Sequence, residues 1–158
     1  MRRTQCLALA LCLGVAPSAG AQLSDEKVLT LAGAKQVVAA AEAAAKQLGA
    51  PGGAIAVVDP GGHLLLAERL DGTFPAAAPL AQEKARSAAA FRKPTADFEN
   101  AIKNGRLSLL ANGELLPLQG GLPLFVGGRI VGAIGVSGAA SAQQDEDIAK
   151  AAVAALGE

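Results

Sequence analysis

Few side chains in this sequence carry the chemistry that catalysis or metal binding commonly uses. The chain has one histidine, His63, two cysteines, Cys6 and Cys12, and neither tyrosine nor tryptophan. A nucleophilic Cys/His pair needs both residue types side by side, and zinc sites usually combine several His or Cys ligands at short spacings. Because the cysteines lie near the N-terminus and no such spacing occurs, the sequence favours neither kind of site.

The glycine-containing motifs are similarly unspecific for catalysis. Ser137 lies in a Gly-Val-Ser-Gly run that lacks the spacing of a nucleophile elbow, and we interpret it as a turn residue. No G-x-x-x-x-G-K-[ST] phosphate loop is present. Gly120 and Gly121 have two interpretations of equal weight. Their N–H groups could bind an anion, or the missing side chains could let a strand pass close to a helix.

Two predicted hairpins position His63 and the glycines. The β-branched segment 54–59 and its partner 63–69 flank Pro60-Gly61-Gly62, and the segments 122–126 and 129–136 flank Gly127-Gly128. Short apolar runs on either side of such a turn are typical of antiparallel strands. The sequence therefore predicts two β-hairpins.

The first predicted helix starts after Thr30, which can cap it, and ends at Gly49. Apolar residues recur there at steps of three and four, which places them on one stripe of the helix. They are Leu31, Ala34, Val38, Ala41, Ala45 and Leu48. Because alanine makes this helix slim, we expect it to pack closely on a sheet or on another subunit.

Three more helices are predicted, at 78–91, at 95–103 and after the capping box of residues 141–144. Pro75 and Pro79 bound the helix at 78–91 upstream, and Pro94 bounds it downstream. The acidic residues 145–147 fit the first turns of the last helix, where the helix dipole favours negative charge. The segment 107–118 is ambiguous, and we expect a short strand there. Antiparallel strands with covering helices indicate an α+β layered domain.

The first 21 residues have the pattern of a secretory signal peptide. Arg2 and Arg3 precede an apolar stretch at 7–16 and a small-x-small site ending at Ala21. We expect cleavage after Ala21, no membrane span in the mature chain, and a single domain at 22–158 that is periplasmic or extracellular. The mature chain then contains no cysteine, so it forms no disulfide.

The charge of the mature chain argues against nucleic-acid partners. Cleavage removes Arg2 and Arg3 and leaves twelve basic and fourteen acidic residues, a formal charge of −2. Proteins that bind nucleic acids or anionic membranes usually carry a basic footprint. We therefore expect neither kind of partner.

Several motifs follow one another along most of the mature chain. They are residues 56–64 (AVVDPGGHL), 69–72 (RLDG), Lys84-Ala85, Phe91, Thr95, 120–123 (GGLP) and 135–138 (GVSG). In this order they resemble the GlcG/HbpS family and the C-terminal part of PduO-type proteins. The resemblance implies a profilin-like fold and assembly into homo-oligomers. It also implies, for some members, binding or slow degradation of haem, and a sensor kinase as partner of extracellular members. Other members accompany glycolate or diol metabolism.

The sequence offers few residues that could bind the iron of the haem that the resemblance implies. Haem iron usually takes His, Cys, Met or Tyr as its axial ligand, and His63 is the only such residue after position 21. His63 has a plainer interpretation as a solvent-facing residue beside a turn. The iron could also be open or weakly held by an oxygen ligand such as Thr95. Either arrangement suits a sensor or scavenger better than an electron carrier.

By the same resemblance, eight residues are candidates for the cofactor site. They are His63, Arg69, Asp71, Lys84, Thr95, Gly120, Gly121 and Pro123. Arg69 and Asp71 have an alternative in pairing with each other, and Lys84 lies in an alanine-rich segment that could bury it. Arg86, Arg92 and Lys93 could pair with haem carboxylates or remain solvated.

Taken together, the sequence predicts a secreted or periplasmic haem-binding homo-oligomer that senses haem or degrades it slowly. The alternative is an oligomeric partner of a sensor protein, or a domain that binds a small organic acid, with no role for haem. Slim alanine-rich surfaces favour burial between copies in both cases.

Overall fold

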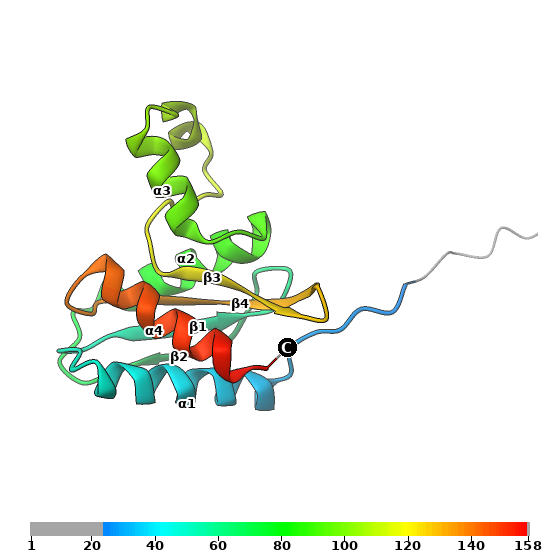
Figure 1. Cartoon of the computed structure of the whole chain (residues 1–158), viewed down its shortest axis with the longest axis vertical. Helices are drawn as coiled ribbons and strands as arrows, with labels where there is room; N and C mark the ends of the chain where they lie inside the picture. Colours follow the sequence, from blue (N-terminus) through cyan, green and yellow to red (C-terminus); the bar gives the residue numbers. More distant parts are fainter. Residues whose placement is uncertain (1–23, 158) are drawn as a thin grey trace, which may run out of the picture.

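The computed structural model describes residues 24–157, so the predicted signal peptide lies outside the described residues. Helices cover both faces of a four-stranded antiparallel sheet (Figure 1). Helices α1 (Leu31–Gln47) and α4 (Ala142–Ala155) pack on one face, and α2 (Ala77–Phe91) packs on the other. The predicted α+β layered architecture is confirmed.

The two predicted hairpins form the sheet. Its strands are β1 (Ala54–Val58), β2 (Leu64–Arg69), β3 (Gly121–Val126) and β4 (Arg129–Ser137), in the spatial order β2-β1-β4-β3. The register places Ala54 opposite both Arg69 and Ser137, and Gly121 opposite Gly135. Arg69, Ser137 and Gly121 therefore lie toward one end of the sheet, and the two hairpin turns lie at the other end. Ser137 ends a strand and is buried, so the interpretation as a turn residue is wrong.

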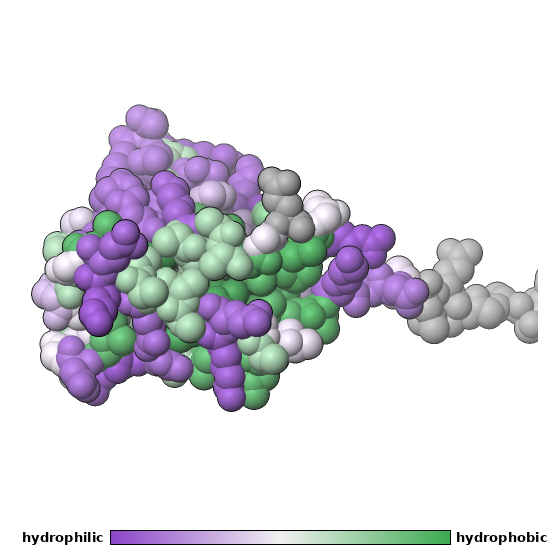
Figure 2. All heavy atoms as spheres, turned by 60° about the horizontal axis from the view of Figure 1, so that its bottom comes forward, coloured by the Kyte–Doolittle hydropathy of each residue, from purple (hydrophilic) through white to green (hydrophobic). Residues whose placement is uncertain are grey.

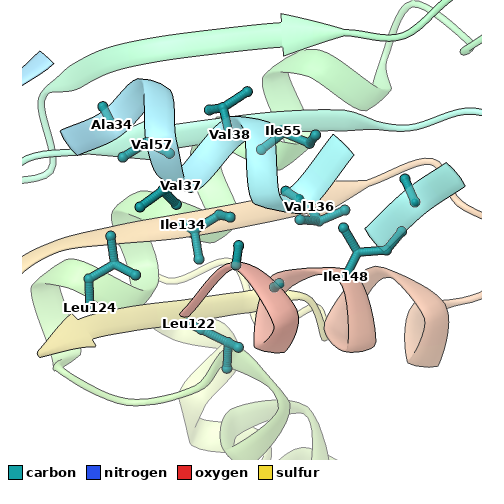
Figure 3. Close-up of a cluster of buried hydrophobic side chains, with 14 of the residues drawn as sticks. Ala34, Val37, Val38, Ile55, Val57, Leu122, Leu124, Ile134, Val136 and Ile148 are labelled. Atoms are coloured by element: carbon teal, nitrogen blue, oxygen red, sulfur yellow. The ribbon is translucent and has the colours of Figure 1, made fainter. Parts of the chain in front are cut away.

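The two faces of the sheet carry different side chains. Figure 3 shows branched side chains of the sheet, among them Ile55, Val57 and Ile134, facing α1 and α4. The opposite face presents small residues to α2, including Ala56 and Ala133. α2 approaches so closely that a Cβ on Gly135 would overlap the Ala81 carbonyl oxygen. The close approach of helix and sheet that we expected for the first helix is thus most pronounced for α2.

The helix ends follow the capping residues in the sequence, with small differences. Thr30 Oγ1 accepts a hydrogen bond from Gly33 N at 3.1 Å, and Ser141 Oγ accepts one from Gln144 N at 3.1 Å. Gln144 Oε1 accepts from Ala140 N, one residue before the cap. α2 begins at Ala77, so Pro79 lies in its first turn, where a missing N–H costs no hydrogen bond.

The ends of the apolar stripe on α1 remain exposed. Leu31 is 50% exposed and Leu48 is 46% exposed, while the middle of the stripe is buried. Figure 2 shows apolar side chains gathered on the side of the molecule that α1 and α4 form. Burial of this surface between copies stays a prediction.

Helix α3 (Thr95–Lys103) and the 3₁₀ helix η1 (Leu107–Ala111) project from the body (Figure 1). The expected strand within 107–118 does not form. Residues 107–111 make the 3₁₀ turn, and Asn112 Oδ1 then accepts from Glu114 N at 3.0 Å, which bends the chain. No helix within residues 24–157 is long and apolar enough to cross a bilayer.

Candidate functional site

Five of the eight candidate residues fall into two groups at opposite ends of the sheet. Lys84, Thr95, Gly120 and Gly121 come together where β3 begins, and His63 lies at the turn between β1 and β2. The residues predicted as one cofactor site therefore do not form one cluster.

The first group is organised by a buried ion pair. Lys84 Nζ lies 3.0 Å from Asp145 Oδ2 and donates to the Val136 carbonyl oxygen at 2.8 Å. Asp145 Oδ1 accepts from Ala139 N at 2.9 Å. The Lys84 and Asp145 side chains are only 4% and 8% exposed, so the partial burial expected for Lys84 is confirmed and is nearly complete. Paired and hydrogen-bonded, both charges are satisfied inside the protein.

Gly120 and Gly121 permit the close passage of β3 over α2. A Cβ on Gly121 would lie 2.5 Å from the Lys84 carbonyl oxygen, and one on Gly120 would lie 3.1 Å from Lys84 Nζ. Gly121 N already donates to Thr95 Oγ1 at 2.8 Å. Of the two interpretations of these glycines, the structure favours close packing over anion binding. Pro123 is buried in β3 opposite Ala133, on the face that α2 covers.

Thr95 and Glu99 attach α3 to this junction. Thr95 is fully buried, and the Gly121 backbone occupies its hydroxyl, which does not fit a role as an oxygen ligand of iron. Glu99 Oε2 accepts from Gln119 N at 2.7 Å. The hydrogen bond from Lys103 lowers the pKa of Glu99. Burial opposes that shift, and the Gln119 N–H and the charge of Lys84 reinforce it. The first group thus holds α2, α3, α4 and β3 together.

Arg69 and Asp71 lie at the same end of the sheet but take no part in that network. Both are exposed, and the expected pairing between them does not form. Arg69 Nη1 instead reaches toward the Thr73 carbonyl oxygen at 3.5 Å. Thr73, which the sequence analysis missed, holds the loop because its Oγ1 accepts from Gly53 N at 2.7 Å.

The second group consists of His63 and the carboxylate that orients it. Asp59 Oδ1 accepts from the backbone N–H groups of Gly61 at 2.8 Å and His63 at 2.9 Å. His63 Nδ1 lies 3.2 Å from each carboxylate oxygen, and the imidazole is 83% exposed. Burial pushes the pKa of Asp59 upward, but the hydrogen bonds from His63 and Gly61 outweigh it, so the pKa lies below its ordinary value. The charged Asp59 carboxylate therefore stabilises the turn and orients the His63 imidazole.

A cavity of about 270 Å³ lies beside this turn. Residues from the hairpin and from α2 line it, namely Gly61, Gly62, His63, Leu64, Gln82 and Arg86. Arg86 is half-exposed and reaches Glu83 at 3.1 Å and Glu114 at 3.9 Å. Gln82 was missed in the sequence, although its i, i+4 spacing from Arg86 places both on one side of α2. His63 and a guanidinium thus share one open site that could accept an anionic ligand with an apolar body.

A comparison with protein families identifies the family of the chain. Residues 29–154 match the family model described as haem degrading protein, HbpS-like. The chain belongs to the HbpS-like family. The family resemblance inferred from the sequence motifs is therefore confirmed.

Individual relatives agree with this assignment. Protein GlcG of Escherichia coli K12 is 48% identical over 83 residues, a match that spans 52% of this chain and 62% of GlcG. A crystal structure of a double mutant of Streptomyces reticuli HbpS superposes with a TM-score of 0.79 at 34% identity, covering 92% of this chain and 99% of that one. A crystal structure of a PduOC–haem complex has a TM-score of 0.72 at 29% identity and covers 81% and 94%.

Proposed function

We propose that this protein binds haem beside the turn between β1 and β2, with His63 Nε2 as the axial ligand of the iron. The family description and the haem-bound PduOC relative support haem as the ligand. His63 carries the assignment because it is the only conventional haem ligand after residue 21, and its ring stands exposed at a cavity.

Asp59 fits the role of the group that orients this ligand. Metal-bound histidines commonly donate their second ring N–H to a carboxylate, which fixes the tautomer and raises the basicity of the ligand. With Asp59 accepting at Nδ1, the His63 Nε2 lone pair is left for iron. Bound haem would supply the iron chemistry, and His63 would be the residue of each chain that holds the iron.

Arg86 and Leu64 fit the rest of the cofactor. The Arg86 guanidinium can pair with a haem propionate, and Leu64, which is 47% exposed, can pack against the porphyrin. The cavity of about 270 Å³ is smaller than the roughly 300–1,000 Å³ of most ligand pockets. One chain therefore covers only part of the ring. We propose that a second copy of the chain covers the remainder, so that the protein acts as a homo-oligomer.

We also propose that the protein is exported and that haem sensing or slow haem breakdown takes place outside the cytoplasm. The support is the signal-peptide pattern of residues 1–21. Expression of the full chain in a Gram-negative host, followed by mass spectrometry of the periplasmic fraction, should give a product that starts at Gln22. Retention of residues 1–21 on a cytoplasmic product would contradict export.

A hemin titration of the purified mature chain tests the haem proposal. We expect a saturable Soret band with one hemin per chain or per chain pair. His63→Ala should shift that band and weaken binding by about tenfold or more, since a coordinate bond is lost. Lys46→Ala, on the exposed side of α1, is the matched control and should bind as the wild type does. A spectrum equal to that of free hemin, or an unchanged spectrum for His63→Ala, would refute the proposal.

A further inference from the structure

A second cavity lies between the turn that joins β1 and β2, the start of β4 and the segment before α1. It has a volume of about 250 Å³, and its lining shares no residue with the cavity beside His63. Pro60 and Ile130 supply apolar surface, and Arg92, Arg129 and Lys27 supply positive charge. Asp25 and Glu26 also line it, so its cations outnumber its carboxylates by one.

Arg92 occupies this site at a conformational cost. It follows the last residue of α2 with φ 53° and ψ 38°, and among residues 24–157 it is the only non-glycine residue with positive φ. This C-terminal position usually carries glycine, because a Cβ disfavours the left-handed region. A residue that keeps a strained conformation beside a cavity suggests a function for its side chain.

Arg129 enters the cavity from the second hairpin. It is the first residue of β4, directly after the Gly127-Gly128 turn. Its Nη1 donates to the Asp25 carbonyl oxygen at 2.9 Å, which leaves the remaining guanidinium donors for another partner. Neither Arg92 nor Arg129 forms an ion pair with a carboxylate of residues 24–157. Two guanidinium groups at one small cavity, without acidic partners among these residues, are suited to an oxyanion.

We propose that Arg92 and Arg129 bind a small organic carboxylate in this cavity. Guanidinium groups pair with carboxylates through parallel N–H···O bonds. The apolar side chains of Pro60 and Ile130 can contact a short carbon skeleton, which a phosphate ion lacks. The two cavities share no lining residue, so carboxylate binding here can be tested independently of haem binding.

Calorimetric titration of the haem-free mature chain tests this site, with malonate as the probe and inorganic phosphate as the comparison. We expect saturable malonate binding, tighter than that of phosphate. Arg129→Gln keeps an N–H donor but loses the charge, and should weaken malonate binding by about tenfold or more. Arg106→Ala, an exposed arginine outside the cavity, should leave it unchanged. Absence of malonate binding would overturn the site, and equal binding of phosphate would overturn its assignment to carboxylates.

Arg92→Gly separates a binding role from a structural one. Glycine relieves the left-handed strain, so the variant should melt at a higher temperature than the wild type in the absence of ligand. The same variant should lose the rise in melting temperature that malonate causes in the wild type. A lower melting temperature without ligand would contradict the strain argument, and a malonate-induced rise equal to that of the wild type would overturn the proposal.

Discussion

Two acid–base pairs at opposite ends of the sheet show how the same interaction serves different purposes. The side chains of Lys84 and Asp145 are 4% and 8% exposed, whereas those of His63 and Asp59 are 83% and 31% exposed. A buried pair must satisfy all its polar atoms within the protein, because an uncompensated charge there is costly. An exposed pair can leave a nitrogen for a ligand. The comparison teaches that burial commits Lys84 to the fold and exposure makes His63 available for binding.

The largest effect should come from breaking the buried pair. Lys84→Met leaves the Asp145 carboxylate buried without its cation, which should lower the free energy of unfolding by about 3–5 kcal/mol. Urea denaturation followed by circular dichroism measures this loss. His63→Ala, which removes a member of the exposed pair, should cost less than about 1 kcal/mol in the same assay.

A double variant shows whether the buried charge causes the loss. Lys84→Met combined with Asp145→Asn leaves no charge at this pair, and the amide oxygen that replaces the carboxylate can still accept from Ala139 N. The double variant should be more stable than Lys84→Met alone. Equal or lower stability would mean that lost packing, and not the unpaired carboxylate, explains the effect.

The next effect comes from the glycine that lets β3 pass over α2. A Cβ on Gly121 would lie 2.5 Å from the Lys84 carbonyl oxygen and 2.7 Å from Thr95 Cγ2, so Gly121→Ala should cost about 1–3 kcal/mol of unfolding free energy. Gly113→Ala is the matched control, because no atom lies within 4 Å of its added Cβ. Thermal melts of both variants give the comparison. A loss no greater than that of Gly113→Ala would contradict the close approach of strand and helix.

The smallest effect concerns acid stability at the buried end. The hydrogen bond from Lys103 keeps the folded-state pKa of Glu99 below its ordinary value of 4.5, against the opposing effect of burial. Ionised Glu99 therefore stabilises the fold above pH 4.5, and this contribution is lost as the pH falls through the lower folded-state value.

Glu99→Gln removes that contribution at every pH. The difference in urea midpoint between wild type and Glu99→Gln should be largest near neutral pH and should shrink as the pH falls below 4.5. A difference that stays constant over this range would mean that Glu99 does not titrate with a lowered pKa.

Local patterns predicted the hairpins and most helices. Gly61-Gly62 and Gly127-Gly128 between β-branched runs specified the turns, and Thr30 and Ser141 specified helix starts, because these interactions join residues close in sequence. The motif order identified the family, which also supplied the fold.

The partners within each site could not be predicted in the same way. Lys84 and Asp145 are 61 residues apart, and the acidic run at 145–147 has a sufficient local explanation in the helix dipole. Only the packing of α2 and α4 about β4 brings the two charges together. Asp59 and His63 differ from that pair, because only four residues separate them and they lie in one turn. The sequence contains enough information to predict this contact, although the sequence analysis did not pair the two residues.

Resonance Raman spectroscopy of the haem complex tests the role of His63 most directly. The wild-type complex should show an iron–histidine stretch in its ferrous form. His63→Gly should lack it, and added imidazole should restore an iron–imidazole stretch. An iron–histidine stretch that persists in His63→Gly without imidazole, or that is missing from the wild-type complex, would contradict the assignment of this exposed histidine as the haem ligand.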